Sequence, residues 1–412
     1  MKRRRLYIGI SILITLLIAA LVGWALFVGN QQQELQKDTA DLGYFGGSTD
    51  SSGGGGLFGG IFGGDNDPEN TTVSTEPQPI LRQLYNLPTA GFIKKRSNAI
   101  RFVDRATGHV FERDLPEGAT TRVDQTTVPQ VYEAYLTEDG DGVIRRYIDS
   151  EDNITSVYSR VGEGDKNRTL SNANTIRVMP SGSSILYIEE TGAGSVLSTL
   201  SLEEGSAPKK VTSSNLRGWE VDAKDAFALL TQKPSGTLPG SSYVLDLTTG
   251  AKKLILQQAT GLMAKISPDG TRVLYSDTQE GSLPKLSIRN IETNATIRLD
   301  ASGFAEKCVW SLAGAKIYCA LPNSFPQVLY PDAWYQGDVH FSDSLWEIDT
   351  LTGEMRQLFS PKESEGISID MVSLSTDLTG RVIFFINKTD QTLWSITLPS
   401  EEEVSDTAEN ES

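Results

Sequence analysis

Residues 266–275 read ISPDGTRVLY. The proline, aspartate and glycine at the centre favour a tight turn, and the β-branched and aromatic residues that follow suit a half-buried strand. The same order recurs in residues 178–188, VMPSGSSILYI, and in residues 309–318, VWSLAGAKIY. The chain therefore contains a repeated hairpin of two strands joined by a short turn.

The hairpin recurs with a nearly constant period. A spacing of about 40–45 residues that carries four short strands is typical of β-propeller blades. The intervals are 42, 42, 44, 44, 44 and 64, and one insertion explains the longer last interval. We therefore predict an all-β, seven-bladed β-propeller over residues 80–399. Aligned on the turn, the copies fall at Asn98, Gly140, Gly182, Ala226, Gly270, Gly314 and near Leu378.

Each repeat has room for four strands, a to d. A second turn precedes the outer strand at residues 248–250, 292–294 and 351–353. The seventh copy, residues 372–398, supplies strands a, b and c only. Residues 80–85, ILRQLY, stand where a d strand belongs. We expect them to close the ring on the last blade, which removes an exposed sheet edge.

The stretch ISPDGTRVLY resembles the repeat of TolB-type propellers, the bacterial relatives of WD-repeat proteins. The resemblance covers most of residues 80–398 and is more specific for fold than for function. TolB itself is a secreted periplasmic protein with an extra N-terminal domain. The arrangement of this chain is more similar to membrane-anchored bacterial propeller proteins.

The N-terminus predicts a membrane anchor. Residues 6–28 carry no charge, and 23 helical residues at about 1.5 Å each are long enough to cross the hydrocarbon core. The basic tail of residues 1–5, MKRRR, should stay in the cytoplasm. The alternative is a cleaved signal peptide, whose apolar stretch is shorter, about 7–15 residues. We expect a single-pass protein of the cytoplasmic membrane with an extracytoplasmic propeller.

Composition limits the partners. Residues 29–79 are rich in glycine and predict a disordered tether, and residues 400–412 predict a disordered acidic tail. The formal net charge is −16, although the N-terminal tail is basic. Such a surface disfavours nucleic-acid binding and a second, electrostatic attachment to anionic lipid. The mean hydropathy of −0.24 excludes a polytopic membrane protein.

Cys308 and Cys319 lie on the two sides of one predicted turn. A hairpin that turns at residues 312–315 places them opposite each other on strands a and b. In an oxidising compartment this arrangement favours a disulfide. The alternative is a pair of buried free thiols.

The long last interval places an insertion at residues 323–343, in a loop between strands b and c. Loops on a rigid scaffold often carry function, and Trp and Tyr are frequent anchors of recognition surfaces. The insertion therefore predicts a binding surface. Alternatively, its aromatic residues fold back and plug the mouth of the propeller. The candidate binding residues are Tyr330, Asp332, Trp334, Tyr335, Asp338 and His340.

Enzyme signals are weak. The chain has two histidines, His109 and His340, and no G-x-S-x-G nucleophile motif. We predict no catalytic residue, metal or cofactor. The favoured function is a protein-interaction platform in the cell envelope. The alternatives are a propeller that binds carbohydrate or a cell-wall polymer and, more distantly, a glycan-cleaving propeller with carboxylates at its central channel.

Overall fold

The computed structural model describes residues 79–399, apart from residues 97, 164–166, 171–172, 225 and 279–282. The predicted basic tail, membrane helix and acidic tail lie outside the described residues, as does the predicted tether up to residue 78. Within the described part of the chain, no helix is both long and apolar enough to cross a membrane.

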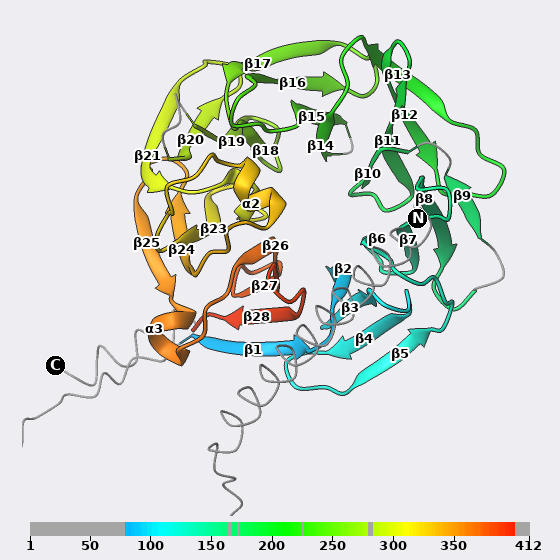
Figure 1. Cartoon of the computed structure of the whole chain (residues 1–412), viewed down its shortest axis with the longest axis horizontal. Coiled ribbons are helices and arrows are strands. Elements are labelled where there is room, and N and C mark those ends of the chain that lie inside the picture. The colour runs from blue at the N-terminus through cyan, green and yellow to red at the C-terminus, as the bar shows by residue number, and fades with distance from the viewer. Residues whose placement is uncertain are drawn as a thin grey trace, which may run out of the picture. The chain divides into compact units, whose positions relative to one another are not determined.

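Seven four-stranded antiparallel sheets surround a central channel (Figure 1). The predicted seven-bladed propeller is thus confirmed. From the channel outward, strands a to d are β2 (Thr89–Lys94), β3 (Ala99–Asp104), β4 (Val110–Asp114) and β5 (Thr120–Asp124) in blade 1; β6 (Glu133–Leu136), β7 (Gly142–Ile148), β8 (Ile154–Arg160) and β9 (Arg168–Leu170) in blade 2; β10 (Thr175–Val178), β11 (Ser184–Thr191), β12 (Gly194–Ser201) and β13 (Lys209–Ser214) in blade 3; and β14 (Trp219–Ala223), β15 (Phe227–Gln232), β16 (Gly240–Asp246) and β17 (Lys252–Ala259) in blade 4.

The remaining blades follow the same order. They are β18 (Met263–Ile266), β19 (Arg272–Asp277), β20 (Lys285–Asn290) and β21 (Thr296–Ser302) in blade 5; β22 (Cys308–Trp310), β23 (Lys316–Pro322), β24 (Asp343–Asp349) and β25 (Met355–Phe359) in blade 6; and β26 (Met371–Thr376), β27 (Val382–Asn387), β28 (Leu393–Thr397) and β1 (Ile80–Tyr85) in blade 7. Short helices η2 (Ala305–Lys307) and α3 (Pro361–Glu365) precede blades 6 and 7, and α2 (Asp332–Gln336) lies in the insertion.

The first strand of the propeller closes the ring on the last blade, as the sequence predicts. Strand β1 pairs with β28 in antiparallel register, and Ile80 lies opposite Thr397. Leu84 of β1 is buried in a cluster with Phe102 of blade 1 and Phe384 of blade 7. The closing strand therefore contributes both hydrogen bonds and core to the joint between the first and last blades.

The repeated turn explains why the hairpins form where they do. In blade 5, the backbone N–H of Gly270 donates to the carbonyl of Ser267, and the φ of Gly270 is +71°, in the left-handed region that favours glycine. A Cβ atom at Gly270 would lie 2.4 Å from the ring of Phe227, in the preceding blade. The glycine thus serves both the turn and the contact between blades.

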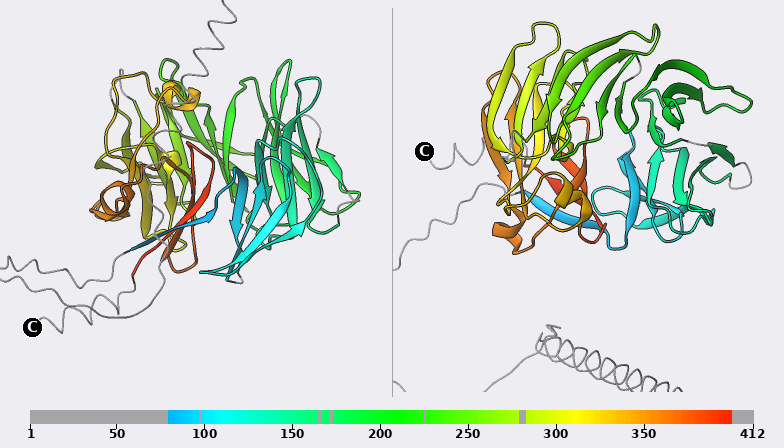
Figure 2. Two further views of the ribbon diagram at one scale, coloured as in Figure 1. Left: turned by 60° about the horizontal axis from the view of Figure 1, so that its bottom comes forward. Right: turned by 45° about the horizontal axis from the view of Figure 1, so that its top comes forward.

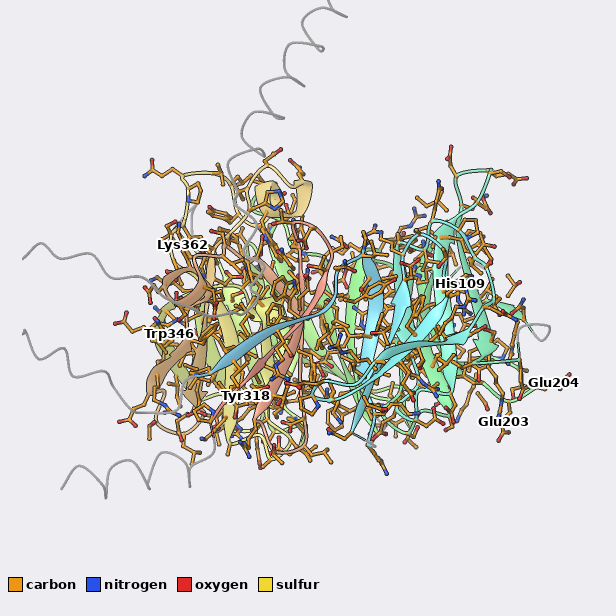
Figure 3. All side chains as sticks on the ribbon, turned by 90° about the horizontal axis from the view of Figure 1, so that it is seen from below. His109, Glu203, Glu204, Tyr318, Trp346 and Lys362 are labelled. Carbon is orange, nitrogen blue, oxygen red and sulfur yellow. A yellow bond between two sulfur atoms is a disulfide. The ribbon has the colours of Figure 1, made fainter. Side chains whose placement is uncertain are left out.

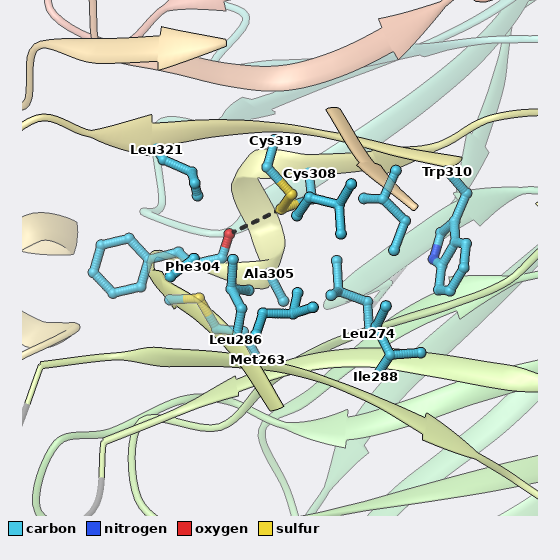
Figure 4. Close-up of a cluster of buried hydrophobic side chains, with 14 of the residues drawn as sticks. Met263, Leu274, Leu286, Ile288, Phe304, Ala305, Cys308, Trp310, Cys319 and Leu321 are labelled. Carbon is cyan, nitrogen blue, oxygen red and sulfur yellow. Dashed lines mark hydrogen bonds between the residues drawn. A yellow bond between two sulfur atoms is a disulfide. The ribbon is translucent and has the colours of Figure 1, made fainter. Parts of the chain in front are cut away.

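The core lies between neighbouring blades. Figure 4 shows the cluster between blades 5 and 6, which includes Leu274, Ile288 and Trp310. Cys308 and Cys319 face each other in this cluster, in the predicted register, and form a disulfide. The predicted disulfide is confirmed, and the alternative of two free thiols is wrong.

Each end of the ring carries a different set of connections. One end, the loop face, carries the connections between strands b and c, including the insertion. The opposite end, the turn face, carries the tight turns between strands a and b. Figure 2 shows α2 of the insertion at one rim of the ring.

Candidate functional site

The insertion connects β23 to β24 on the loop face, and α2 is its only helix within the described residues. Gly337 ends this helix with a φ of +82°. The insertion leans toward the channel rather than outward, as Figure 1 shows for α2. Its contacts with the blades therefore decide which of its side chains are available to a partner.

Trp334 is not exposed as a binding residue would be; its ring folds back onto the blades, as in the alternative drawn from the sequence. Its side chain is 1% exposed and stacks on Phe304, with ring centroids 5.0 Å apart and an interplanar angle of 16°. Tyr330 is also buried, and its ring packs edge-on against Phe304 and Phe325. Phe304, from the connection before blade 6, and the aromatic residues of the insertion form one cluster that holds both side chains inward, so these two residues are core.

The other four candidate residues remain at the surface or the rim. Tyr335 is 44% exposed, and its hydroxyl donates to the Glu306 carboxylate at 2.5 Å. Asp332 is partly buried, and Asp338 is exposed. His340 is about half exposed, with Nδ1 3.9 Å from Oδ2 of Asp370. The six candidates are thus divided between core and rim.

Three buried charges lie beneath the insertion. Lys307, Asp343 and Asp370 are completely buried. The ammonium of Lys307 lies 2.7 Å from Asp343 Oδ2 and 2.6 Å from Asp370 Oδ1. The indole N–H of Trp334 donates to Asp370 Oδ2 at 3.1 Å, and the backbone N–H of Met371 donates to Asp343 Oδ2 at 2.6 Å. This charge cluster fastens the insertion to blades 6 and 7.

One atom of the charge cluster lacks a hydrogen bond. Asp343 Oδ1 is buried and has no partner. Burial raises the pKa of Asp343 to about 6; Lys307 opposes this shift and Asp370 adds to it. The carboxyl therefore binds its proton more tightly in the folded protein than in the unfolded chain.

This raised pKa predicts a pH-dependent difference between the protein and an Asp343→Asn variant. A raised folded-state pKa contributes stability that is complete below about pH 4 and lost as the pH rises through about 6. The variant lacks this contribution. We expect the stability of the wild type relative to the variant to fall by about 2 kcal/mol between pH 4.5 and 7.5. Thermal unfolding at both pH values measures it, because the carboxylates outside the charge cluster are the same in both proteins. An equal difference at both pH values would contradict the prediction.

The insertion is also hydrogen-bonded to the b–c loops of blades 4 and 7. Asp332 Oδ2 accepts a hydrogen bond from the backbone N–H of Gly236, in the b–c loop of blade 4, at 2.5 Å. The ammonium of Lys388, in the b–c loop of blade 7, donates to the Trp334 carbonyl at 2.8 Å. The insertion thus joins three b–c loops into one hydrogen-bonded structure on the loop face.

Beside this structure, the central channel contains a cavity of about 800 Å³. Charged side chains of the inner strands line it, and Tyr335 contributes from the insertion. Arg177 Nη2 lies 3.6 Å from Glu220 Oε2, and the ammonium of Lys265 donates to the Cys308 carbonyl at 2.6 Å. Burial raises the pKa of Glu220 and lowers that of Lys265. The charged lining residues are Glu133, Arg177, Glu220, Asp222, Lys224, Lys233, Lys265 and Glu306.

The charged residues of this cavity are not among those predicted from the sequence. Their signal is a charged residue between apolar residues of an inner strand, as at Arg177 in TIRV of β10 and Lys265 in MAKI of β18. Successive side chains of a strand point to opposite sides. The sequence does not, however, distinguish the innermost strand of a blade, whose side chains reach the channel, from the other strands. Among the residues that the structure describes, no group of three or more His, Cys, Asp or Glu side chains is placed to hold a metal ion.

Comparisons with known proteins support the fold alone. No protein-family model matches the chain, and no curated protein matches it. Among solved structures, the chain is similar to an oligogalacturonate lyase in complex with manganese, with a TM-score of 0.51 and 12% identity, over 79% of this chain and 92% of that one. It is also similar to the tricorn protease, with a TM-score of 0.51 and 10% identity, over 81% of this chain and 35% of that one. Fold and neighbours define a seven-bladed β-propeller.

Proposed function

We propose that this protein is a membrane-anchored interaction platform whose loop face binds a protein partner outside the cytoplasm. The observation that supports the proposal is the convergence of two b–c loops, from blades 4 and 6. They are joined by Asp332 and Gly236 and expose Leu238, Leu329 and Tyr335 side chains. Leu238 is 70% exposed. Tyr335 also lines the charged cavity of the channel.

The arrangement has the physical character of a recognition surface. Apolar anchors next to fixed polar groups are where binding energy concentrates in protein interfaces. The hydrogen bonds to Gly236 and Glu306 hold the insertion in place before binding, so little ordering cost remains when a partner arrives. The anchoring part of the proposal is supported by the uncharged run of residues 6–28 and its basic flank.

Cross-linking in intact cells tests the proposal. A photo-reactive amino acid placed at position 238 of the full chain should give discrete protein adducts, because Leu238 is the most exposed of the three side chains of the proposed surface. The matched control is position 254, because Leu254 is also an exposed leucine but lies on the outer strand β17. Adducts at both positions in equal amount, or at neither, would contradict the proposal.

Substitutions on this surface should weaken partner binding much more than they lower thermal stability. We expect Tyr335→Ala together with Leu238→Asp to reduce capture of the cross-linked partner about tenfold or more, since anchor residues commonly contribute about 2 kcal/mol or more. The melting temperature should fall by only about 2–4 °C, because Leu238 is exposed and the main loss at Tyr335 is its hydrogen bond to Glu306, which contributes about 1 kcal/mol. The control Leu254→Asp should change neither quantity. Full capture by the double variant would exclude this surface.

Carbohydrate binding remains the alternative function. Two adjacent exposed rings would provide stacking faces for a sugar, but Trp334 is buried and Tyr335 alone remains at the rim. This favours a protein partner over a wall polymer. A glycan array probed with the full chain in detergent distinguishes them, because a carbohydrate binder would retain specific glycans that the Tyr335→Ala variant loses.

A further inference from the structure

Three exposed leucines gather on the turn face of blades 6 and 7. Leu312, Leu351 and Leu378 are 65%, 78% and 70% exposed. The Thr350 backbone N–H donates to the Ala315 carbonyl at 3.0 Å, which places the turn of Leu351 beside that of Leu312. A Cβ atom on Gly380 would lie 2.6 Å from the hydroxyl of Tyr318 in blade 6, so the turn of Leu378 is adjacent. Figure 3 shows Tyr318 toward the rim opposite α2.

The tight turns do not need Leu312 or Leu378. In five blades the a–b turn has the same hydrogen bond, from the N–H of a left-handed glycine to the carbonyl three residues earlier. Two residues before the glycine, the turn favours proline. Blades 3 and 5 have Pro180 and Pro268 there, and blade 2 has Glu138. Blades 6 and 7 instead present leucine to solvent.

Leu351 is likewise an exposed leucine that its turn does not require. It lies in the turn between strands c and d of blade 6, where its N–H donates to Asp349 Oδ1 at 2.8 Å. The matching turns of blades 4 and 5 make the same bond from Thr248 and Glu292. Those two blades thus have polar side chains where blade 6 has leucine. Neither turn geometry nor core packing explains the three leucines, and adjacent exposed apolar side chains often mark an interaction site.

The chain enters the propeller at the same face. Ile80 pairs with Thr397, and Thr397 pairs with Val382, which follows the turn of Leu378. Seventy-nine residues precede Ile80, and residues 6–28 among them form the uncharged run. The covalent path from the predicted anchor therefore reaches the propeller on the turn face, beside the leucines.

We propose that Leu312, Leu351 and Leu378 insert into the interfacial region of the lipid bilayer that holds the anchor. This inference rests on the proposed function, because it requires an anchored chain. A tether converts docking into an intramolecular event, so that a small apolar contact suffices. Exposed leucines are suited to the boundary between headgroups and acyl chains. Docking through the turn face directs Leu238 and Tyr335 away from the membrane, toward a partner.

A fluorescence experiment on the full chain in phosphatidylcholine vesicles tests this docking. An environment-sensitive probe is attached to Ala313→Cys, next to Leu312 and exposed; the native cysteines are joined to each other and do not react. The control probe is on Thr237→Cys, an exposed position of the loop face. We expect about a twofold quenching by lipids with a nitroxide near the headgroup for the probe at 313, and none at 237.

A triple variant, Leu312→Ser with Leu351→Ser and Leu378→Ser, should reduce the quenching at 313 to the control value and leave the melting temperature unchanged. If the chains float with the vesicles but the probe at 313 is not quenched, the proposed docking is wrong, whereas the proposed anchoring still holds. Equal quenching in the triple variant also overturns the docking. A blue shift that grows with protein density and resists the nitroxide would indicate a second copy instead. Chains that do not float with vesicles contradict both anchoring and docking.

Discussion

Replacing Lys307 with methionine is expected to lower the free energy of unfolding by about 3–5 kcal/mol. The ammonium neutralises two carboxylates, Asp343 and Asp370, and all three groups are completely buried. Methionine fills a similar volume but leaves both carboxylates without a counter-ion. Removal of one partner from a buried ion pair is costly because the remaining charge cannot be hydrated. The loss should also loosen Trp334, which donates to Asp370.

Chemical denaturation of the protein and the Lys307→Met variant measures this loss. The matched control is Lys316→Met, because Lys316 forms an ion pair with Glu347 at 3.0 Å but is partly exposed. Exposed pairs contribute about 0–1 kcal/mol, so the control should be nearly neutral. If both variants lost the same small amount of stability, the charge cluster would not be what fastens the insertion.

Deletion of residues 80–85 is expected to lower the melting temperature of the whole propeller in a single cooperative step. Without β1, strand β28 becomes an open edge, and the cluster of Phe102 and Phe384 loses Leu84. Substitution of a buried leucine by alanine alone costs about 2–5 kcal/mol, and the deletion also removes the strand's hydrogen bonds. Circular dichroism against temperature measures the shift.

Two single substitutions in β1 form the control for this deletion. Leu84→Ala should reproduce a large part of the loss because Leu84 is buried, whereas Ile80→Ala should cost about 1 kcal/mol or less because Ile80 is exposed. A truncated chain that melts at the wild-type temperature would show that the ring does not depend on its closing strand.

Most of the fold could be predicted because the blade repeats. Gly140, Gly182, Gly270 and Gly314 recur at regular spacing, and all four have a positive φ in the turn that the sequence indicates. The seventh copy is centred on Gly380 rather than on Leu378. The register of Cys308 and Cys319 followed from turn length, since a short hairpin fixes which residues face each other. Local rules were sufficient for these features.

The candidate site could be predicted only in part. The insertion was located by its length, but an aromatic residue in a loop can face solvent or core, and the partner that decides this for Trp334 is Phe304, in another connection. Lys307 and Asp370 come from the connections that precede blades 6 and 7, Asp343 begins β24, and the three meet only when these two blades pack together. The buried pair of Arg145 and Asp124 joins blades in the same way. Such contacts are non-local and leave no mark on the neighbouring sequence.

The pairing of Ile80 with Thr397 also affects the order in which the protein is made. Strand β1 leaves the ribosome before any blade, whereas its partner β28 is synthesised last. During this interval the blades can form locally one after another, but β1 has no sheet to join. Contacts between such distant segments are slow to form, and unpaired strands aggregate readily. We therefore expect newly made chains to pass through an open, curved stack of blades before β1 and β28 join the two ends.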